Sequence, residues 1–169
     1  VMSPATAAAF GRLGGLGDRD GALRANRQSQ ASCSEWVVQS MRVQLEQLQP
    51  TDEASGRGGL RALRQAYPQA RLDGLERSWP LRWLCALRCP WARVRQGDIW
   101  LADWSSYQLV YLFQRPESMT RALVKAGEMA PGSWLVSLEF PLPGVAPQAQ
   151  WPVREGGRMV WVYCLPLRV

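Results

Sequence analysis

The spacing of apolar and polar positions changes along this chain between the period of strands and the period of helices. Continuous apolar runs predict buried strands at Gln108–Phe113 and Ser133–Phe140, and the segment Glu117–Glu128 between them predicts a helix. Together they predict a βαβ unit with a loop at the carboxyl end of its first strand. Open α/β sheets bind their ligands at that edge.

Shorter patterns precede this unit. Apolar positions predict a helix carrying Leu60, Leu63 and Tyr67 on one face, because residues three and four apart lie together on a helix. The segments that follow predict a strand at Ala70–Glu76, a helix at Trp79–Arg88 and a weak strand at Trp91–Arg95. Strands that alternate with helices predict a mostly parallel sheet between helical layers.

The two ends of the chain differ in pattern. Residues 1–33 have no sustained period, which predicts a flexible N-terminal arm before one domain at residues 34–169. Ser34 is expected to begin a helix that Pro50 ends. Near the other end, two strand patterns flank Gly156-Gly157, which predicts an antiparallel hairpin made by Gln148–Val153 and Arg158–Leu165.

Composition narrows the function classes. The 169 residues are 47% hydrophobic and 20% charged, as expected for one globular domain, and they contain no apolar run of about 18 residues. We therefore expect a protein without a transmembrane segment, located in the cytoplasm. The net charge of +6 comes from arginines spread over the chain, with Lys125 as the one lysine. Because no dense basic run is present, we expect nucleic acid to be an improbable partner.

Cysteine and histidine usage argues against metal and triad chemistry. The cysteines lie at positions 33, 85, 89 and 164 without a CxxC pair, and there is no histidine, so we expect no metal site. The lack of histidine also excludes Ser-His-Asp catalysis. Cys85 and Cys89 lie on one predicted helix, where we expect buried free thiols.

The order of these motifs resembles the class I S-adenosylmethionine-dependent methyltransferases, in particular the group that includes the ATP synthase c-subunit lysine methyltransferases. The motifs that carry the resemblance are, in chain order, SGRGGL, GLE, SWPLRW, GDIW, YQLVYLFQRPESM, WLVSLEFPLP and MVWVY. The resemblance implies an α/β fold, a three-layer Rossmann-like sandwich with a mostly parallel sheet and a C-terminal antiparallel hairpin. It also implies S-adenosyl-L-methionine as the cofactor.

The resemblance implies cofactor-binding roles that the residue types support. Gly56 and Gly58 can form a turn that lets the backbone approach the methionine end of the cofactor closely. Glu76 follows them by some twenty residues and can accept hydrogen bonds from both ribose hydroxyls, although a surface glutamate is the competing interpretation. Asp98 would face the adenine amino group, with Ile99 and Trp100 forming an apolar wall against the ring, although core packing is the competing interpretation of Trp100.

The residues after the strand Gln108–Phe113 are the catalytic candidates. Methyl transfer is an in-line displacement, so the protein mainly aligns the nucleophile and excludes water. Gln114 can orient an incoming amine with its side-chain amide, and Pro116 can stiffen the loop. Arg115 between them is awkward for a cationic lysine substrate, which implies either an outward side chain or an acidic substrate group nearby.

The sequence departs from the family's pattern at the first strand. One alignment takes Asp52–Gly58 as the acidic glycine signature, with Asp52 as its acid. A second alignment takes Leu48–Asp52 as a turn and infers that the strand itself is missing, and we prefer it because Pro50 and the polar neighbours disfavour a buried strand. The sheet would then need a substitute from Arg42–Leu48 or from the N-terminal arm.

Three functions remain open from the sequence. The first is an S-adenosylmethionine-dependent methyltransferase that acts on a protein lysine, the substrate that the resemblance implies. The second is a methyltransferase-like domain without activity that serves as an interaction module. The third is a basic protein that binds nucleic acid or methylates RNA. The sequence does not determine the oligomeric state.

Overall fold

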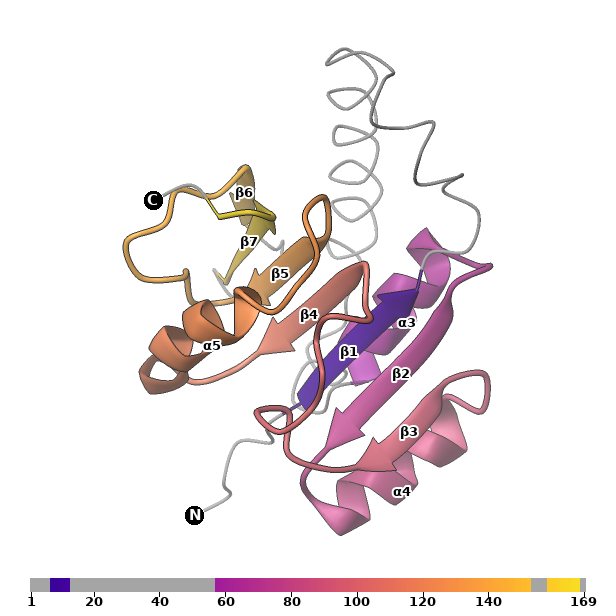
Figure 1. The fold of residues 1–169 in the computed structure, drawn as a ribbon. Coiled ribbons are helices and arrows are strands. Elements are labelled where there is room, and N and C mark those ends of the chain that lie inside the picture. Colours follow the sequence, from indigo (N-terminus) through magenta and orange to yellow (C-terminus); the bar gives the residue numbers. More distant parts are fainter. Residues whose placement is uncertain (1–6, 13–56, 153–157, 168–169) are drawn as a thin grey trace.

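The computed structural model describes residues 7–12, 57–152 and 158–167 of the chain (Figure 1). Its elements are β1 (Ala7–Arg12), α3 (Arg57–Ala66), β2 (Arg71–Glu76), α4 (Trp79–Arg88), β3 (Arg93–Gln96), β4 (Leu109–Phe113), the 3-10 helix η1 (Pro116–Ser118), α5 (Met119–Ala126), β5 (Trp134–Leu138), β6 (Ala149–Pro152) and β7 (Met159–Cys164). The helix expected between Ser34 and Pro50 lies outside the described residues.

The strands form one seven-stranded sheet in the order β3-β2-β1-β4-β5-β7-β6. β2 pairs with β3 and β4 pairs with β5 in parallel, while β7 lies antiparallel between β5 and β6. Five strands (β2, β3, β4, β5 and β6) therefore share one direction. The mostly parallel α/β sheet with an antiparallel terminal hairpin, predicted from the sequence, is confirmed.

The central strand comes from the N-terminal segment. β1 pairs antiparallel with β2 on one side and with β4 on the other, and its arrow in Figure 1 points opposite to theirs. This differs from the expectation that residues 1–33 lie outside the domain as an arm, and it answers the question of which segment substitutes for the missing strand. The physical reason is that, without β1, the facing edges of β2 and β4 would be left without backbone partners in mid-sheet.

Side-chain alternation sorts the sheet into two packed faces. On β2, Leu72 and Gly74 face α3, because a Cβ built on Gly74 would lie 3.0 Å from Leu60 Cδ1. Residues of α3 and α4 build one core with this face, and residues of α5 build the second core on the opposite face. In Figure 1, α3 and α4 lie behind β1, β2 and β3. The fold is therefore a three-layer sandwich.

The strands of the predicted βαβ unit are buried on both faces. Every residue of β5 is buried, as are four of the five residues of β4, which matches the continuous apolar runs that predicted them. Cys85 and Cys89 are buried free thiols, as expected from their spacing on α4. In the described part of the chain, no helix has the length and apolarity needed to cross a membrane.

Candidate active site

Three parallel strands, β2, β3 and β4, end at one edge of the sheet, the edge formed by their carboxyl ends. The last residue of β2 is Glu76 and that of β4 is Phe113, and both pair with the same residue, Ala7 of β1. Glu76 also pairs with Gln96, the last residue of β3. With neighbouring strands about 4.8 Å apart, the ends of β2 and β4 lie about 10 Å apart. The geometry therefore brings Glu76 and Gln114 to the two sides of one strand.

Glu76 is a buried carboxylate with an unsatisfied oxygen. Its side chain is only 2% exposed, and its Oε1 accepts a hydrogen bond from the Ser78 backbone N–H at 3.0 Å. Its Oε2 is buried without a hydrogen-bond partner. Burial raises the pKa of Glu76 above its ordinary value, although hydrogen bonds from the Ser78 and Arg77 backbones oppose this shift. Buried polar atoms are seldom left unpaired, so this oxygen is suited to a ligand's hydroxyl groups.

The start of α4 fixes the Glu76 carboxylate in place. Ser78 is the N-cap residue, and its extended backbone (φ −79°, ψ 123°) turns the chain from β2 into the helix. Pro80 lies in the first turn, where its missing N–H costs no helical hydrogen bond. The Ser78 N–H is left for the carboxylate. The Ser-Trp-Pro sequence is a helix-start signal from which this contact could have been anticipated.

The loop after β3 lies beside the end of β2. The Gly97 N–H donates to the Glu76 carbonyl oxygen at 3.3 Å, which joins the two strand ends. Asp98 Oδ1 accepts the Trp100 N–H at 2.9 Å, so the carboxylate closes a tight turn. Ile99 is 2% exposed and packs in the core beside α5, which leaves little of its side chain to form the expected adenine wall.

Trp100 contributes a contact that sequence reasoning missed. The Arg121 guanidinium from α5 lies over the Trp100 ring, 5.1 Å from its centroid. The contact joins the loop after β3 to the helix after β4, two segments that the sequence pattern gives no reason to pair. Trp100 is therefore held between the two sides of the candidate site.

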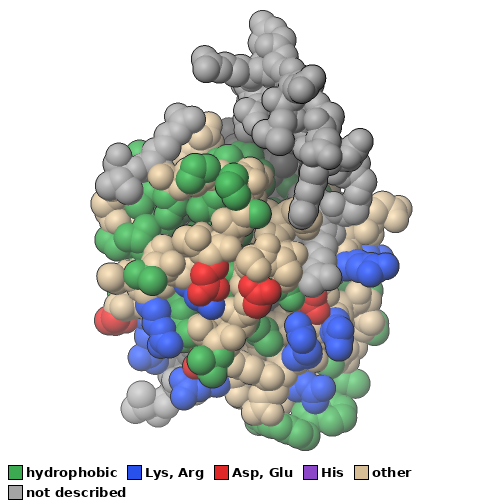
Figure 2. Space-filling view, in the orientation of Figure 1, with side chains coloured by type: hydrophobic (Ala, Val, Ile, Leu, Met, Phe, Trp, Pro, Cys, Tyr) green, Lys and Arg blue, Asp and Glu red, His purple; other side chains and the backbone are tan. Residues whose placement is uncertain are grey.

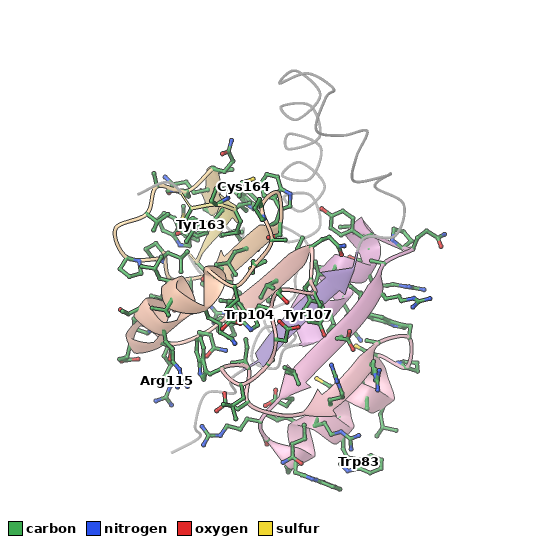
Figure 3. All side chains as sticks on the ribbon, in the orientation of Figure 1. Trp83, Trp104, Tyr107, Arg115, Tyr163 and Cys164 are labelled. Atoms are coloured by element: carbon green, nitrogen blue, oxygen red, sulfur yellow. The ribbon has the colours of Figure 1, made fainter. Side chains whose placement is uncertain are left out.

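The two catalytic candidates lie directly after β4. Gln114 is 6% exposed, and Pro116 is an exposed residue at the start of η1. Arg115 is exposed and extends away from the ribbon (Figure 3). Of the two possibilities for Arg115, the structure therefore has the outward side chain.

The glycine segment is described only in part. Gly58 is the second residue of α3, while Asp52 and Gly56 lie outside the described residues. α3 leads through four residues to the start of β2, and Leu60 lies against Gly74, so the first turn of α3 faces the end of β2 that carries Glu76. Because β1 runs antiparallel, its own carboxyl end, Arg12, lies at the other edge and cannot lead directly into this turn.

Among the described residues, no group of three or more cysteine, aspartate and glutamate side chains is placed to hold a metal ion.

Comparison with solved structures gives a methyltransferase as a neighbour. The chain is similar to an RNA methyltransferase from Salinibacter ruber, solved in complex with S-adenosyl-L-homocysteine. The two share 25% sequence identity with a TM-score of 0.58, over 68% of this chain and 76% of that chain. This chain has a class I methyltransferase fold. No protein family and no curated protein matches the sequence.

Proposed function

We propose that this protein is an S-adenosylmethionine-dependent methyltransferase whose cofactor site lies at the edge where β2, β3 and β4 end. The observation that carries the proposal is the unsatisfied, buried Oε2 of Glu76 at the end of β2. A carboxylate that is held by backbone N–H groups and has one oxygen without a hydrogen-bond partner can accept both hydroxyls of a ribose. The bound S-adenosyl-L-homocysteine of the Salinibacter ruber neighbour supports this choice of ligand.

The other residues of the edge fit the remaining parts of the cofactor. Asp98 would accept the adenine amino group, since its Oδ1 alone is used to cap Trp100. Gly58 lies in the first turn of α3, and a helix N-terminus favours a carboxylate such as that of the methionine moiety. When bound, the cofactor supplies an electrophilic methyl group. Gln114 would orient the acceptor and Pro116 would hold the loop beside it.

The charge beside Gln114 guides the choice of the methyl acceptor. The resemblance implies a protein lysine, whereas the structural neighbour acts on RNA. Arg115 is exposed directly after Gln114, and a positive charge there repels a cationic lysine and attracts a phosphate. We therefore favour nucleic acid over a protein lysine as the acceptor.

One observation favours the interaction module as a second candidate. The glycine turn of this fold normally follows the central strand, and here β1 runs in the opposite direction and ends at the other edge. A turn without that support cannot present its backbone at fixed positions, which would weaken cofactor binding.

Calorimetric titration with S-adenosylhomocysteine separates the two candidates. We expect binding by the wild type and a loss of about 1–3 kcal/mol in Glu76→Gln, because the amide replaces a charged acceptor of two hydroxyls. Glu128→Gln is the matched control: Glu128 pairs with Lys125 on the surface beyond the end of α5. No heat of binding by the wild type at millimolar ligand would favour the interaction module.

A further inference from the structure

An open cleft of about 590 Å³ lies outside the candidate active site. It is lined by Arg64, Pro68, Gln69, Ala70, Arg71, Leu72, Asp73, Trp91, Arg93, Arg95 and Tyr107. Four of these residues are arginines and one is an acid, so the lining is strongly basic. In the sequence the four arginines are spread over more than thirty positions, and the fold gathers them.

The cleft extends from the amino ends of β2 and β3 onto the face of these strands that has no helix over it. Leu72 on β2 and Val94 on β3 face the core beside α3 and α4, so Arg71, Arg93 and Arg95 take the opposite side. The connection from β3 to β4 contains no helix that could cover this side. Figure 2 shows Lys and Arg side chains gathered over this part of the sheet.

The single acid of the cleft is already neutralised. Asp73 Oδ1 lies 3.7 Å from Arg95 Nη2, and Asp73 Oδ2 accepts a hydrogen bond from the Tyr107 hydroxyl at 3.3 Å. In the described part of the chain, Arg71 and Arg93 are exposed and their side chains make no ion pair or hydrogen bond. The cleft therefore presents two uncompensated guanidinium groups on adjacent strands.

Aromatic side chains lie beside these charges. The Arg64 guanidinium stacks over the partly buried Trp91 ring at 5.6 Å from its centroid, and the buried Tyr107 also lines the cleft. Arg93 and Arg95 are about 7 Å apart along β3. Guanidinium groups gathered on neighbouring strands are typical of surfaces that bind a phosphate backbone.

We infer that this cleft binds the sugar-phosphate backbone of a single-stranded nucleic acid, chiefly through Arg71 and Arg93. Arg95 is one residue from the end of β3, so a strand bound along the cleft leads toward the edge that carries Glu76. As a route for delivering a methyl acceptor, the inference rests on the proposed function, whereas the binding itself does not require a cofactor.

The test is fluorescence anisotropy with a labelled single-stranded RNA, measured over a series of salt concentrations without cofactor. We expect Arg71→Gln/Arg93→Gln to weaken binding about tenfold or more at low salt. Each lost phosphate contact should reduce the slope of log K against log salt by about 0.7, so the double variant should lose about 1.4.

The matched control is Arg61→Gln/Arg88→Gln, which removes the same charge from exposed positions of α3 and α4. We expect that pair to leave the salt slope unchanged. Equal weakening by both pairs would overturn the inference, since net charge alone would then explain binding. Polyglutamate provides a second control. If it binds the wild type as tightly as the RNA does, and Arg71→Gln/Arg93→Gln weakens its binding equally, the inference is overturned and the cleft fits an acidic protein instead.

S-Adenosylhomocysteine titration of the same proteins keeps the two proposals separate. Nucleic-acid binding without cofactor binding would remove the proposed function and leave the cleft assignment standing. Cofactor binding by a wild type that does not bind RNA would overturn the cleft assignment and leave the proposed function standing.

Discussion

At the scale of single residues, Glu76 is expected to destabilise the free protein and to bind the cofactor. Its carboxylate is buried at the end of β2, yet only one of its two oxygens has a hydrogen-bond partner. An unsatisfied buried polar atom costs free energy of folding unless water or a ligand satisfies it. The same atom should therefore lower the stability of the free protein and raise its affinity for the cofactor.

The stability of the free protein should depend on pH through this residue. Burial raises the pKa of Glu76 in the folded state above 4.5, the ordinary value that it recovers on unfolding. The folded protein then holds the proton more tightly than the unfolded chain. Stability should fall as pH rises from about 4.5 through the folded-state pKa, and stay constant above it.

Glu76→Gln should remove that decline and raise the free energy of unfolding near neutral pH by on the order of 1 kcal/mol, because the buried charge is gone. Urea denaturation of both proteins from about pH 4 to pH 8 measures the difference. The variant should thus be more stable and bind S-adenosylhomocysteine less well. A variant that is less stable than the wild type throughout this range would contradict the assignment.

At the scale of elements, β1 is the feature that makes this sheet unusual. It occupies the place of a central parallel strand but runs antiparallel to both neighbours, with Ala9 opposite Gly74 on one side and Tyr111 on the other. Its backbone joins the half of the sheet that carries Glu76 to the half that carries Gln114. The spacing between the two sides of the candidate site therefore depends on six N-terminal residues.

Ala9→Pro tests this role of β1. Proline removes an N–H from the middle of the sheet, so we expect the free energy of unfolding to fall by about 2–3 kcal/mol. Ala9→Ser, which keeps the N–H, is the control. Chemical denaturation of both variants gives the comparison. Unchanged stability in Ala9→Pro would mean that residues 7–12 behave as the arm expected from the sequence.

Local signals made most elements predictable. The helix α4 was predicted residue for residue, because Ser78 and Pro80 mark its start and Pro90 follows its end. The strands β4 and β5 were predicted because strands buried on both faces appear as continuous apolar runs. The strand predicted at Trp91–Arg95 begins two residues before β3 and ends one residue before β3 does, since the Arg-Val-Arg-Gln sequence of β3 has one buried position.

The central strand could not be predicted in the same way. The sequence Ala-Ala-Ala-Phe-Gly-Arg of β1 shows neither alternation nor a β-branched residue, and its partners lie some sixty and one hundred residues away. β1 pairs there because the backbone N–H and C=O groups on the facing sides of β2 and β4 need partners, and this need exists only in the assembled sheet. Glu76 was placed correctly at the sheet edge because it ends a parallel strand. The missing partner of its Oε2 required the structure.

At the scale of the whole molecule, the proposed activity uses two surfaces, one for the cofactor and one for the methyl acceptor. The edge where β2, β3 and β4 end would hold the cofactor, and the basic cleft over β2 and β3 would hold the acceptor's backbone. Arg95 belongs to the cleft and lies next to Gln96, the residue that pairs with Glu76, so the two surfaces meet at the end of β3. An acceptor bound in the cleft could therefore reach the edge without a change of fold.

The central claim is that Glu76 receives the ribose hydroxyls of the cofactor. Calorimetry with S-adenosylhomocysteine and with its analogue lacking both ribose hydroxyls, on wild type and Glu76→Gln, tests it most directly. We predict that losing the hydroxyls weakens binding to the wild type by about 1–3 kcal/mol and to the variant by much less, a coupling of at least about 1 kcal/mol. Equal losses in both proteins, or no binding of either ligand by the wild type, would contradict the account.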